Sequence, residues 1–373
     1  MRRPSLALLA SLVLVGALVP GCDDDSSDGA APPTSRTGGS EGSTTSTLPA
    51  PGHFVGAWTA GENDVWALTS EPCPRPDSDK ARCGVVSRSP DNGGAWTRLS
   101  RLDIGTTNDS TTDSVTAVHF ADARHGWVYN RNLFATFNGG RRWQPVDLGN
   151  PVVALESTGT SAYALAGSCG YGVGNCNGPM RLYEGTISTG RWRFVSLGFE
   201  LPPTDVGNFV VSRSGIYAVI VRGLEQTFLA RTGNARWERR TLPCPRALVA
   251  PIQGQDGLVV ACRPPAPTGP VELQTSSDGG RTWAVVWQHS FPSPVSALAV
   301  TGSATVIGLE NGDVIRSVDN GMNFATVVQA GAAPSIRFAD AERGTLLAGS
   351  PGERQLFRTG DGGATWRAVP PPE

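Results

Sequence analysis

The chain has 373 residues, 33 acidic and 31 basic side chains, and a formal net charge of −2. This near balance argues against a general nucleic-acid binder, which needs a strongly basic face. Beyond the N-terminal segments about 320 residues remain, enough for one large β domain, and none of them shows a sustained 3.6-residue apolar period.

The first residues predict export. Residues 1–21 have a basic start, Arg2 and Arg3, and then a mostly apolar run over residues 6–19. This run is shorter than the ~20 residues of a membrane span and is typical of a signal peptide. The sequence Val19-Pro20-Gly21-Cys22 resembles the bacterial lipobox, which implies lipidation of Cys22 and anchoring at the extracytoplasmic face of the cell membrane. The alternative is an ordinary secretory signal followed by a spare thiol.

Residues 22–52 are rich in Ser, Thr, Gly and Pro and contain almost no large apolar side chain. Such a segment cannot bury enough surface to fold, and about 30 residues of coil would reach roughly 30 Å. We expect a disordered tether that holds the following domain, residues 53–373, away from a membrane. No later segment of the sequence is long and apolar enough to span a bilayer.

A short pattern recurs along residues 53–373: a Ser or Thr, an Asp or Asn two residues later, a Gly two further, and then an aromatic three later. Trp192 and Trp237 mark two worn copies, and the seven aromatics are 41 to 49 residues apart. A fixed period of this length is the signature of a β-propeller with one blade per repeat. The complete copies are Ser89, Asp91, Gly93 and Trp96; Thr136, Asn138, Gly140 and Trp143; Ser276, Asp278, Gly280 and Trp283; Ser317, Asp319, Gly321 and Phe324; and Thr359, Asp361, Gly363 and Trp366.

Each repeat contains four short β-rich runs separated by turn residues. The sequence therefore predicts an all-β fold, a single seven-bladed propeller of four-stranded antiparallel blades, with strands a to d from the axis outward. Every repeat holds its own strand d, which allows ring closure without strand exchange, but pairing of residues 51–57 with the last blade is equally open, and the sequence does not decide between the two modes. The predicted blades span roughly residues 53–100, 114–148, 150–197, 205–242, 247–288, 294–329 and 333–370.

The recurring pattern is interpreted as a c–d hairpin turn. An Asp or Asn oxygen and a Ser or Thr hydroxyl bond backbone N–H groups of such a turn, and Gly supplies positive φ. The aromatic then starts strand d and packs between sheets. A structural role is favoured over a binding role because a binding site is rarely copied in every blade.

These residues resemble the Asp-box, or BNR repeat, of sialidases, sortilin-type receptors, xyloglucan-cleaving glycosidases and photosystem II assembly-factor-like propellers. The resemblance covers residues 54–370. In blade count and exported setting the chain resembles the assembly-factor-like propellers, although nothing in these residues implies photosynthesis.

Six cysteines follow Cys22, and an even number in an exported chain suggests disulfides. Proximity favours the pairs Cys73–Cys83, Cys169–Cys176 and Cys244–Cys262 among fifteen pairings. A metal site is not expected, because no Cys-x₂-Cys spacing occurs and only four His are present. All three pairs fall on the face of the b–c loops and the links between blades, where the longer loops also lie. This long-loop face is either a recognition surface or simply a set of stabilised exposed loops.

The sequence gives little support for an enzymatic function. The Phe/Tyr-Arg-Ile-Pro sequence of Asp-box sialidases is absent, since Ser335-Ile336-Arg337-Phe338 lacks the Pro, and those enzymes have six blades. A glycosidase needs two carboxylates about 5–10 Å apart, which sequence alone cannot pair. We find no motif for a cofactor. A carbohydrate-active propeller, either a glycoside hydrolase or a lectin, remains the alternative function.

Four residues are candidates for ligand contact. His119, Glu156 and Arg337 align on the innermost strands and could approach the axis, the alternative being that each faces a neighbouring blade or solvent. Tyr171 lies among glycines on the long-loop face. The leading hypothesis is an envelope-anchored binding propeller that recognises a protein partner through the long-loop face, with an envelope glycan as the other class of partner.

Overall fold

The computed structural model describes residues 53–60, 63–73, 82–105, 115–167, 178–204, 206–233, 235–264, 269–332, 334–350 and 353–372. The predicted signal peptide, Cys22 and the tether lie outside these residues. Within the described part the secondary structure is β throughout, and no helix there has the length and apolarity needed to cross a membrane.

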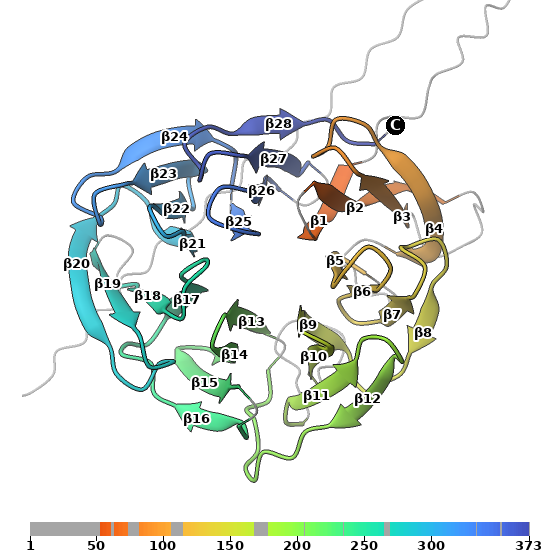
Figure 1. Cartoon of the computed structure of the whole chain (residues 1–373), viewed down its shortest axis with the longest axis horizontal. Coiled ribbons are helices and arrows are strands. Elements are labelled where there is room, and N and C mark those ends of the chain that lie inside the picture. Colours follow the sequence, from red (N-terminus) through yellow and green to blue (C-terminus); the bar gives the residue numbers. More distant parts are fainter. Residues whose placement is uncertain are drawn as a thin grey trace, which may run out of the picture. The chain divides into compact units, whose positions relative to one another are not determined.

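Seven four-stranded antiparallel sheets surround a central axis, which confirms the predicted propeller (Figure 1). In each sheet the strands pair in sequence order, and the first strand is the innermost. Blades 1 to 3 consist of β1 (His53–Ala60), β2 (Asp64–Pro72), β3 (Arg82–Ser89) and β4 (Thr97–Gly105); β5 (Ala117–Phe120), β6 (Gly126–Tyr129), β7 (Leu133–Thr136) and β8 (Gln144–Val146); and β9 (Val152–Thr158), β10 (Ser161–Ala166), β11 (Arg181–Thr186) and β12 (Arg191–Phe194).

The remaining blades repeat the same order of strands. Blades 4 and 5 consist of β13 (Val206–Ser212), β14 (Gly215–Arg222), β15 (Glu225–Thr232) and β16 (Glu238–Arg240); and β17 (Ala247–Pro251), β18 (Leu258–Cys262), β19 (Pro270–Ser276) and β20 (Ala284–Ser290). Blades 6 and 7 consist of β21 (Val295–Val300), β22 (Thr305–Leu309), β23 (Asp313–Ser317) and β24 (Ala325–Gln329); and β25 (Ser335–Phe338), β26 (Gly344–Ala348), β27 (Gln355–Thr359) and β28 (Arg367–Val369).

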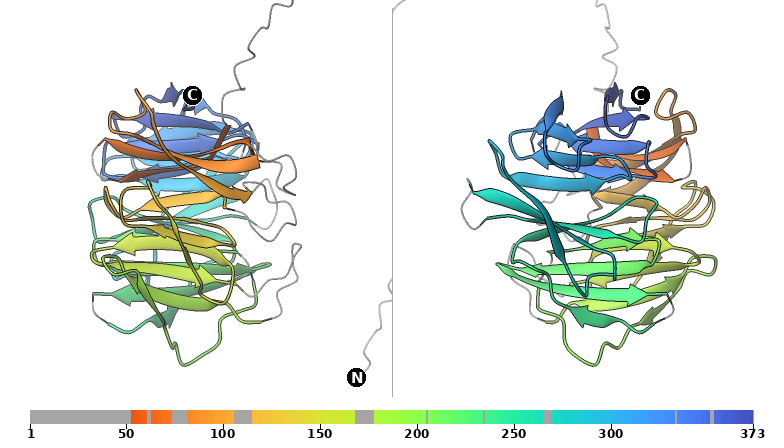
Figure 2. Two further views of the ribbon diagram at one scale, coloured as in Figure 1. Left: turned by 90° about the vertical axis from the view of Figure 1, so that its right-hand side faces the viewer. Right: turned by 60° about the vertical axis from the view of Figure 1, so that its left-hand side comes forward.

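The strands run between two faces of the ring (Figure 2). The a–b turns and the c–d turns share one face, which we call the turn face. Backbone bonds join these turns within a blade: Gly139 N–H donates to Arg124 O at 2.8 Å, and Gly362 N–H donates to Glu342 O at 2.8 Å. The b–c loops and the links between blades therefore share the opposite, long-loop face.

The five complete copies of the recurring pattern form the same hydrogen bonds. In blade 6 the Ser317 hydroxyl donates to Asp319 Oδ1 at 2.7 Å and accepts the Gly321 N–H at 2.9 Å, while Asp319 Oδ1 also accepts the Asn323 N–H at 2.9 Å. Asn320 (φ 58°) and Gly321 (φ 86°) are left-handed. A Cβ on Gly321 would overlap the Trp287 ring of blade 5, so both backbone conformation and space require Gly. The matching bonds occur in blades 1, 2, 5 and 7.

The aromatic of the pattern packs against the preceding blade. Phe324 lies 5.3 Å from Trp287, measured between ring centroids. The worn copies behave alike, because Trp192 lies 6.3 Å from Trp127 and Trp237 lies 5.8 Å from Tyr163. One detail differs from the prediction: the aromatic precedes strand d in six blades, and only Trp192 lies inside the strand. In the complete copies the residue before the aromatic donates its N–H to the Asp or Asn side chain. The pairing of strand d with strand c therefore begins only after the aromatic.

Ring closure uses side chains rather than an exchanged strand. Blades 1 and 7 each contain four strands of their own. Trp96 Nε1 donates to Pro370 O at 3.0 Å, and an Arg354 Nη atom donates to Val55 O at 2.7 Å. Backbone pairing between the two blades is limited, in the described residues, to one bridge between Phe54 and Arg354. Of the two modes that the sequence left open, the structure thus has closure without strand exchange, and the pairing of the first strand with the last blade is this single bridge.

Replacing Ser317 by Ala should destabilise the fold by about 1–3 kcal/mol, because the buried Gly321 N–H loses its acceptor. The control is Ser303→Ala, at an exposed serine of the same blade, which should change stability by less than about 0.5 kcal/mol. Urea unfolding of both variants measures the difference. Equal effects of the two substitutions would contradict a special role for the turn hydroxyl.

Acid should weaken these turns. The Asn323 N–H, the Ser317 hydroxyl and the Asn323 side chain hold the pKa of Asp319 at about 2, below its ordinary value of 3.8. A carboxyl whose pKa is lower in the folded protein stabilises the fold above about pH 4, and this contribution is lost as the pH falls through about 2. Asp319→Asn keeps the Oδ1 acceptor, as Asn138 does in blade 2. Its melting temperature should therefore fall less steeply than that of the wild type over this range; parallel profiles would refute the assignment.

Candidate functional site

A layer of seven side chains, one from each innermost strand, surrounds the axis. Their equivalence follows from register, because each pairs with the corresponding position of the second strand. Four successive blades contribute large or polar groups, and the other three contribute small apolar ones. In order from blade 7 through blades 1 to 6, the layer consists of Arg337, Trp58, His119, Glu156, Val210, Ala250 and Ala299.

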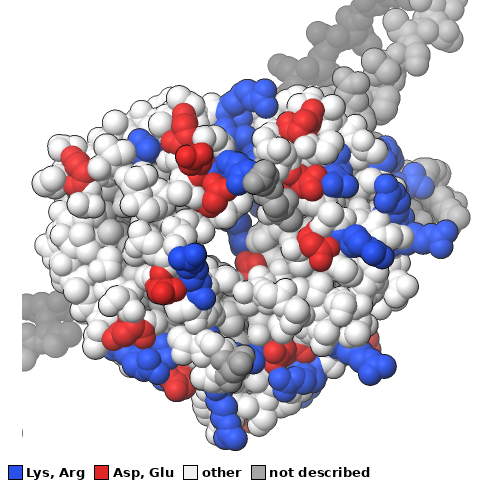
Figure 3. Space-filling view, viewed as in Figure 1, with Lys and Arg blue, Asp and Glu red and all other residues white. Residues whose placement is uncertain are grey.

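An axial cavity of about 460 Å³ lies along this layer. Figure 3 shows the ring hollowed at its centre, with charged side chains of both signs nearby. Its walls include Trp58, Glu156 and Arg337 on one side and Val210 and Ala250 on the other. Because the side chains of blades 4 to 6 are small at this level, the ring leaves space there that the larger groups of blades 7 to 3 do not fill.

Arg337 contacts both Trp58 of blade 1 and Glu156 of blade 3. Its guanidinium carbon lies 4.6 Å from the centre of the Trp58 ring, a cation–π distance. An Nη atom of Arg337 lies 3.2 Å from Glu156 Oε2, although the two residues belong to blades 7 and 3. The Arg337 side chain is nevertheless 48 % exposed. It therefore keeps donors available to a ligand in the cavity.

His119 lies behind this surface and is fully buried. Its Nε2 is 2.7 Å from Ser157 Oγ and 3.5 Å from Glu156 Oε1, and its ring centre is 3.9 Å from that of Trp58. Burial first, and the Arg337 charge second, lower the pKa of His119 well below its ordinary value of 6.5. The ring is therefore neutral at pH 7, so its 3.5 Å approach to Glu156 is not an ion pair, and Ser157 is its hydrogen-bond partner.

Burial also raises the pKa of Glu156 above its ordinary value of 4.5, and the Arg337 charge opposes this shift. Among the described residues that line the axial cavity, Glu156 is the one carboxylate, whereas a glycosidase needs two. Nor does any group of three His, Cys, Asp or Glu suited to a metal ion occur in the described part of the chain. The arrangement is suited to binding through Arg337.

The structure thus brings His119, Glu156 and Arg337 together, but in different roles. Arg337 and Glu156 line the cavity, whereas His119 faces the neighbouring blade at Ser157. Trp58, which the sequence analysis did not single out, completes the cluster. Alignment of the repeats could have found Trp58, because it occupies in blade 1 the position that His119 occupies in blade 2. Tyr171 lies outside the described residues.

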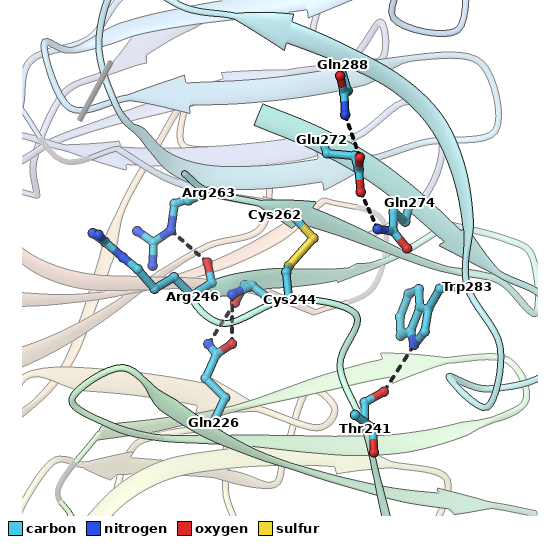
Figure 4. Close-up of a disulfide and its surroundings, with 11 residues drawn as sticks. Gln226, Thr241, Cys244, Arg246, Cys262, Arg263, Glu272, Gln274, Trp283 and Gln288 are labelled. Carbon is cyan, nitrogen blue, oxygen red and sulfur yellow. Dashed lines mark hydrogen bonds between the residues drawn. A yellow bond between two sulfur atoms is a disulfide. The ribbon is translucent and has the colours of Figure 1, made fainter. Parts of the chain in front are cut away.

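Two of the three predicted disulfides are present. Cys73–Cys83 and Cys244–Cys262 have Cα–Cα distances of 5.1 and 5.8 Å; Cys169 and Cys176 lie outside the described residues. Cys244–Cys262 ties the link into blade 5 to the end of β18 (Figure 4). Beside it Gln226 of blade 4 donates to Ala247 O at 2.9 Å and accepts the Ala247 N–H at 2.7 Å. This part of the long-loop face is therefore fixed by covalent and hydrogen bonds.

The His119 ring should remain neutral as the pH is lowered through 6.5, because protonation would place a charge in a buried site next to Arg337. NMR titration of the imidazole Cε1–H resonance measures this directly, and His119→Gln assigns the signal. A titration midpoint at or above 6.5 would contradict the burial argument.

No family model and no curated protein matches the chain. Solved structures do resemble it. One described as YCF48 bound to D1 peptide is 16% identical, with a TM-score of 0.55 over 84% of this chain and 94% of that chain. YCF48 from Cyanidioschyzon merolae is 14% identical, with a TM-score of 0.53 over 84% and 97%. The acylaminoacyl peptidase of Pyrococcus horikoshii is 8% identical, with a TM-score of 0.55 over 87% and 53%. At these identities the likeness is one of fold.

Proposed function

We propose that this chain is an exported, lipid-anchored propeller that binds a protein partner through its long-loop face. The observation that carries the proposal is a group of exposed, large apolar side chains at the long-loop ends of blades 3 and 4. Exposed apolar side chains gathered on one surface are typical of protein interaction sites.

The four side chains belong to consecutive elements that end on this face. Phe194 is the last residue of β12, Phe199 lies in the link between the blades, and Val206 is the first residue of β13. Leu224 lies in the hairpin between β14 and β15. Phe194, Val206 and Leu224 are 57, 53 and 68 % exposed. This end of the molecule is therefore suited to a partner with its own apolar side chains.

Three further observations support the proposal. The fold resembles that of YCF48, which has been solved with a D1 peptide bound, so a propeller of this kind can hold a peptide. The hydrogen bonds of the recurring turns agree with the Asp-box resemblance, which is shared with the assembly-factor-like propellers. The signal peptide and Cys22 expected from the sequence would place the ring outside the cell membrane. In the axial cavity, Arg337 and Glu156 are the groups that would contact a ligand.

Site-specific photocrosslinking in intact cells tests the assignment of the face. A photoreactive residue at Leu224 should give a discrete protein adduct, because this side chain is exposed on the proposed surface. The matched control is Met322, an equally large apolar residue that is 71 % exposed on the turn face of blade 6. We expect an adduct from position 224 and none from position 322, resolved by gel shift and mass spectrometry.

A second experiment places the photoreactive residue at the neighbouring position Phe199. Leu224→Asp should then reduce the yield of the adduct from position 199 by tenfold or more, on the order of 1.4 kcal/mol. Met322→Asp should leave this yield unchanged. Adducts of equal yield from both faces, or none from either, would reject the long-loop face as the binding surface.

A further inference from the structure

Four blades carry an arginine immediately before the Ser or Thr of the recurring turn: Arg88, Arg231, Arg316 and Arg358. Two of these arginines are neutralised, because Arg88 lies 2.7 Å from Asp64 Oδ1 and Arg231 lies 2.9 Å from Glu184 Oε1. Arg316 is half-buried and donates to Gly362 O at 2.9 Å, so water can still reach its charge. Arg358 differs from all three.

Arg358 is only 6 % exposed, yet among the described residues its hydrogen bonds reach neutral acceptors. One Nη atom donates to Thr59 Oγ1 at 2.7 Å and the other donates to Asn92 Oδ1 at 2.6 Å. Burial first, and then the charges of Arg343 and Arg367, lower the pKa of Arg358 to about 10 against the weaker opposing charge of Asp340, so it remains charged at pH 7. A buried cation without a carboxylate partner is costly in a folded protein.

A cavity of about 400 Å³ adjoins this side chain at the seam between blades 7 and 1, on the turn face. Arg343 and Arg367 also line it, together with Asn92, Thr365 and Glu342. Arg343 is bonded to Asp340 Oδ2 at 2.6 Å, and Glu342 is the one acidic residue of the described lining. Counting Asp340, the three cations Arg343, Arg358 and Arg367 face two anions, so one positive charge at this cavity is not balanced.

We propose that this seam cavity is a binding site for a small oxyanion, such as phosphate, sulfate or a carboxylate group. The guanidinium groups of Arg358 and Arg367 supply planar N–H donors of the kind that pair with such anions. An anion held there would compensate the Arg358 charge. Because the cavity is lined by Asn92 of blade 1 and by residues of blade 7, the same anion would also link the two ends of the ring.

Thermal unfolding of the full-length protein tests the site. Inorganic phosphate, sulfate and acetate are titrated separately, with sodium chloride added to keep the ionic strength constant. At least one of the three should raise the melting temperature along a saturable curve. A response to phosphate or sulfate alone identifies a tetrahedral oxyanion as the ligand, and a response to acetate identifies a carboxylate. The absence of a saturable response to all three would overturn the proposal.

Variants distinguish anion binding at the seam cavity from a general stabilisation of the protein by salt. Arg367 is exposed, so Arg367→Ala should fold and weaken the apparent affinity about tenfold, as expected for the loss of one charge-assisted bond. Glu342→Gln should strengthen binding by removing the acid from the lining. Arg213→Ala, at an exposed arginine of the turn face in blade 4, is the control and should bind as the wild type does. Arg367→Ala and Arg213→Ala giving the same curve would equally overturn the assignment.

Discussion

In five of the seven blades, the hydrogen bond from the glycine N–H to the Ser or Thr hydroxyl determines how the blade meets its predecessor. It holds the glycine in the left-handed region, where its missing Cβ lets the preceding blade approach. A Cβ at Gly280 would lie 2.6 Å from Phe228 of blade 4, and one at Gly93 would lie 2.5 Å from Val369 of blade 7. The spacing of the sheets is thus set by a local turn, and the adjacent aromatic fills the remaining gap.

Because the recurring turns set the spacing of the sheets, the side chains of the innermost strands can differ from blade to blade. Their side chains at the axial layer take no part in the recurring turns, so Arg337 and Glu156 can occupy positions where other blades have Val210 or Ala250. The result is an asymmetric cavity in a ring of repeated parts. Residues that depart from the repeat, rather than those that follow it, are therefore where specific function is expected in such a chain.

Sequence predicted the fold because the turn chemistry is local and recurs. Even the worn copies at Trp192 and Trp237 could be placed, since the aromatic alone keeps the period. The axial cluster was predicted only in part. Alignment could suggest that His119 and Arg337 lie on equivalent strands, but the contact of Arg337 with Glu156 joins blades 7 and 3, and no periodicity encodes a contact across the ring.

The seam cavity was beyond prediction for a similar reason. Asn92 and Arg358 are 266 residues apart, and they meet only once the ring closes. The ion pairs of Arg88 and Arg231 also had to be seen before the lack of one at Arg358 could be recognised.

Each sheet of this ring comes from one uninterrupted stretch of chain. A cut between any two blades would leave every sheet whole, so circular permutation could in principle move the termini to a new junction. The same property makes tandem duplication of a whole repeat a simple evolutionary step, since the added segment brings all four of its strands with it.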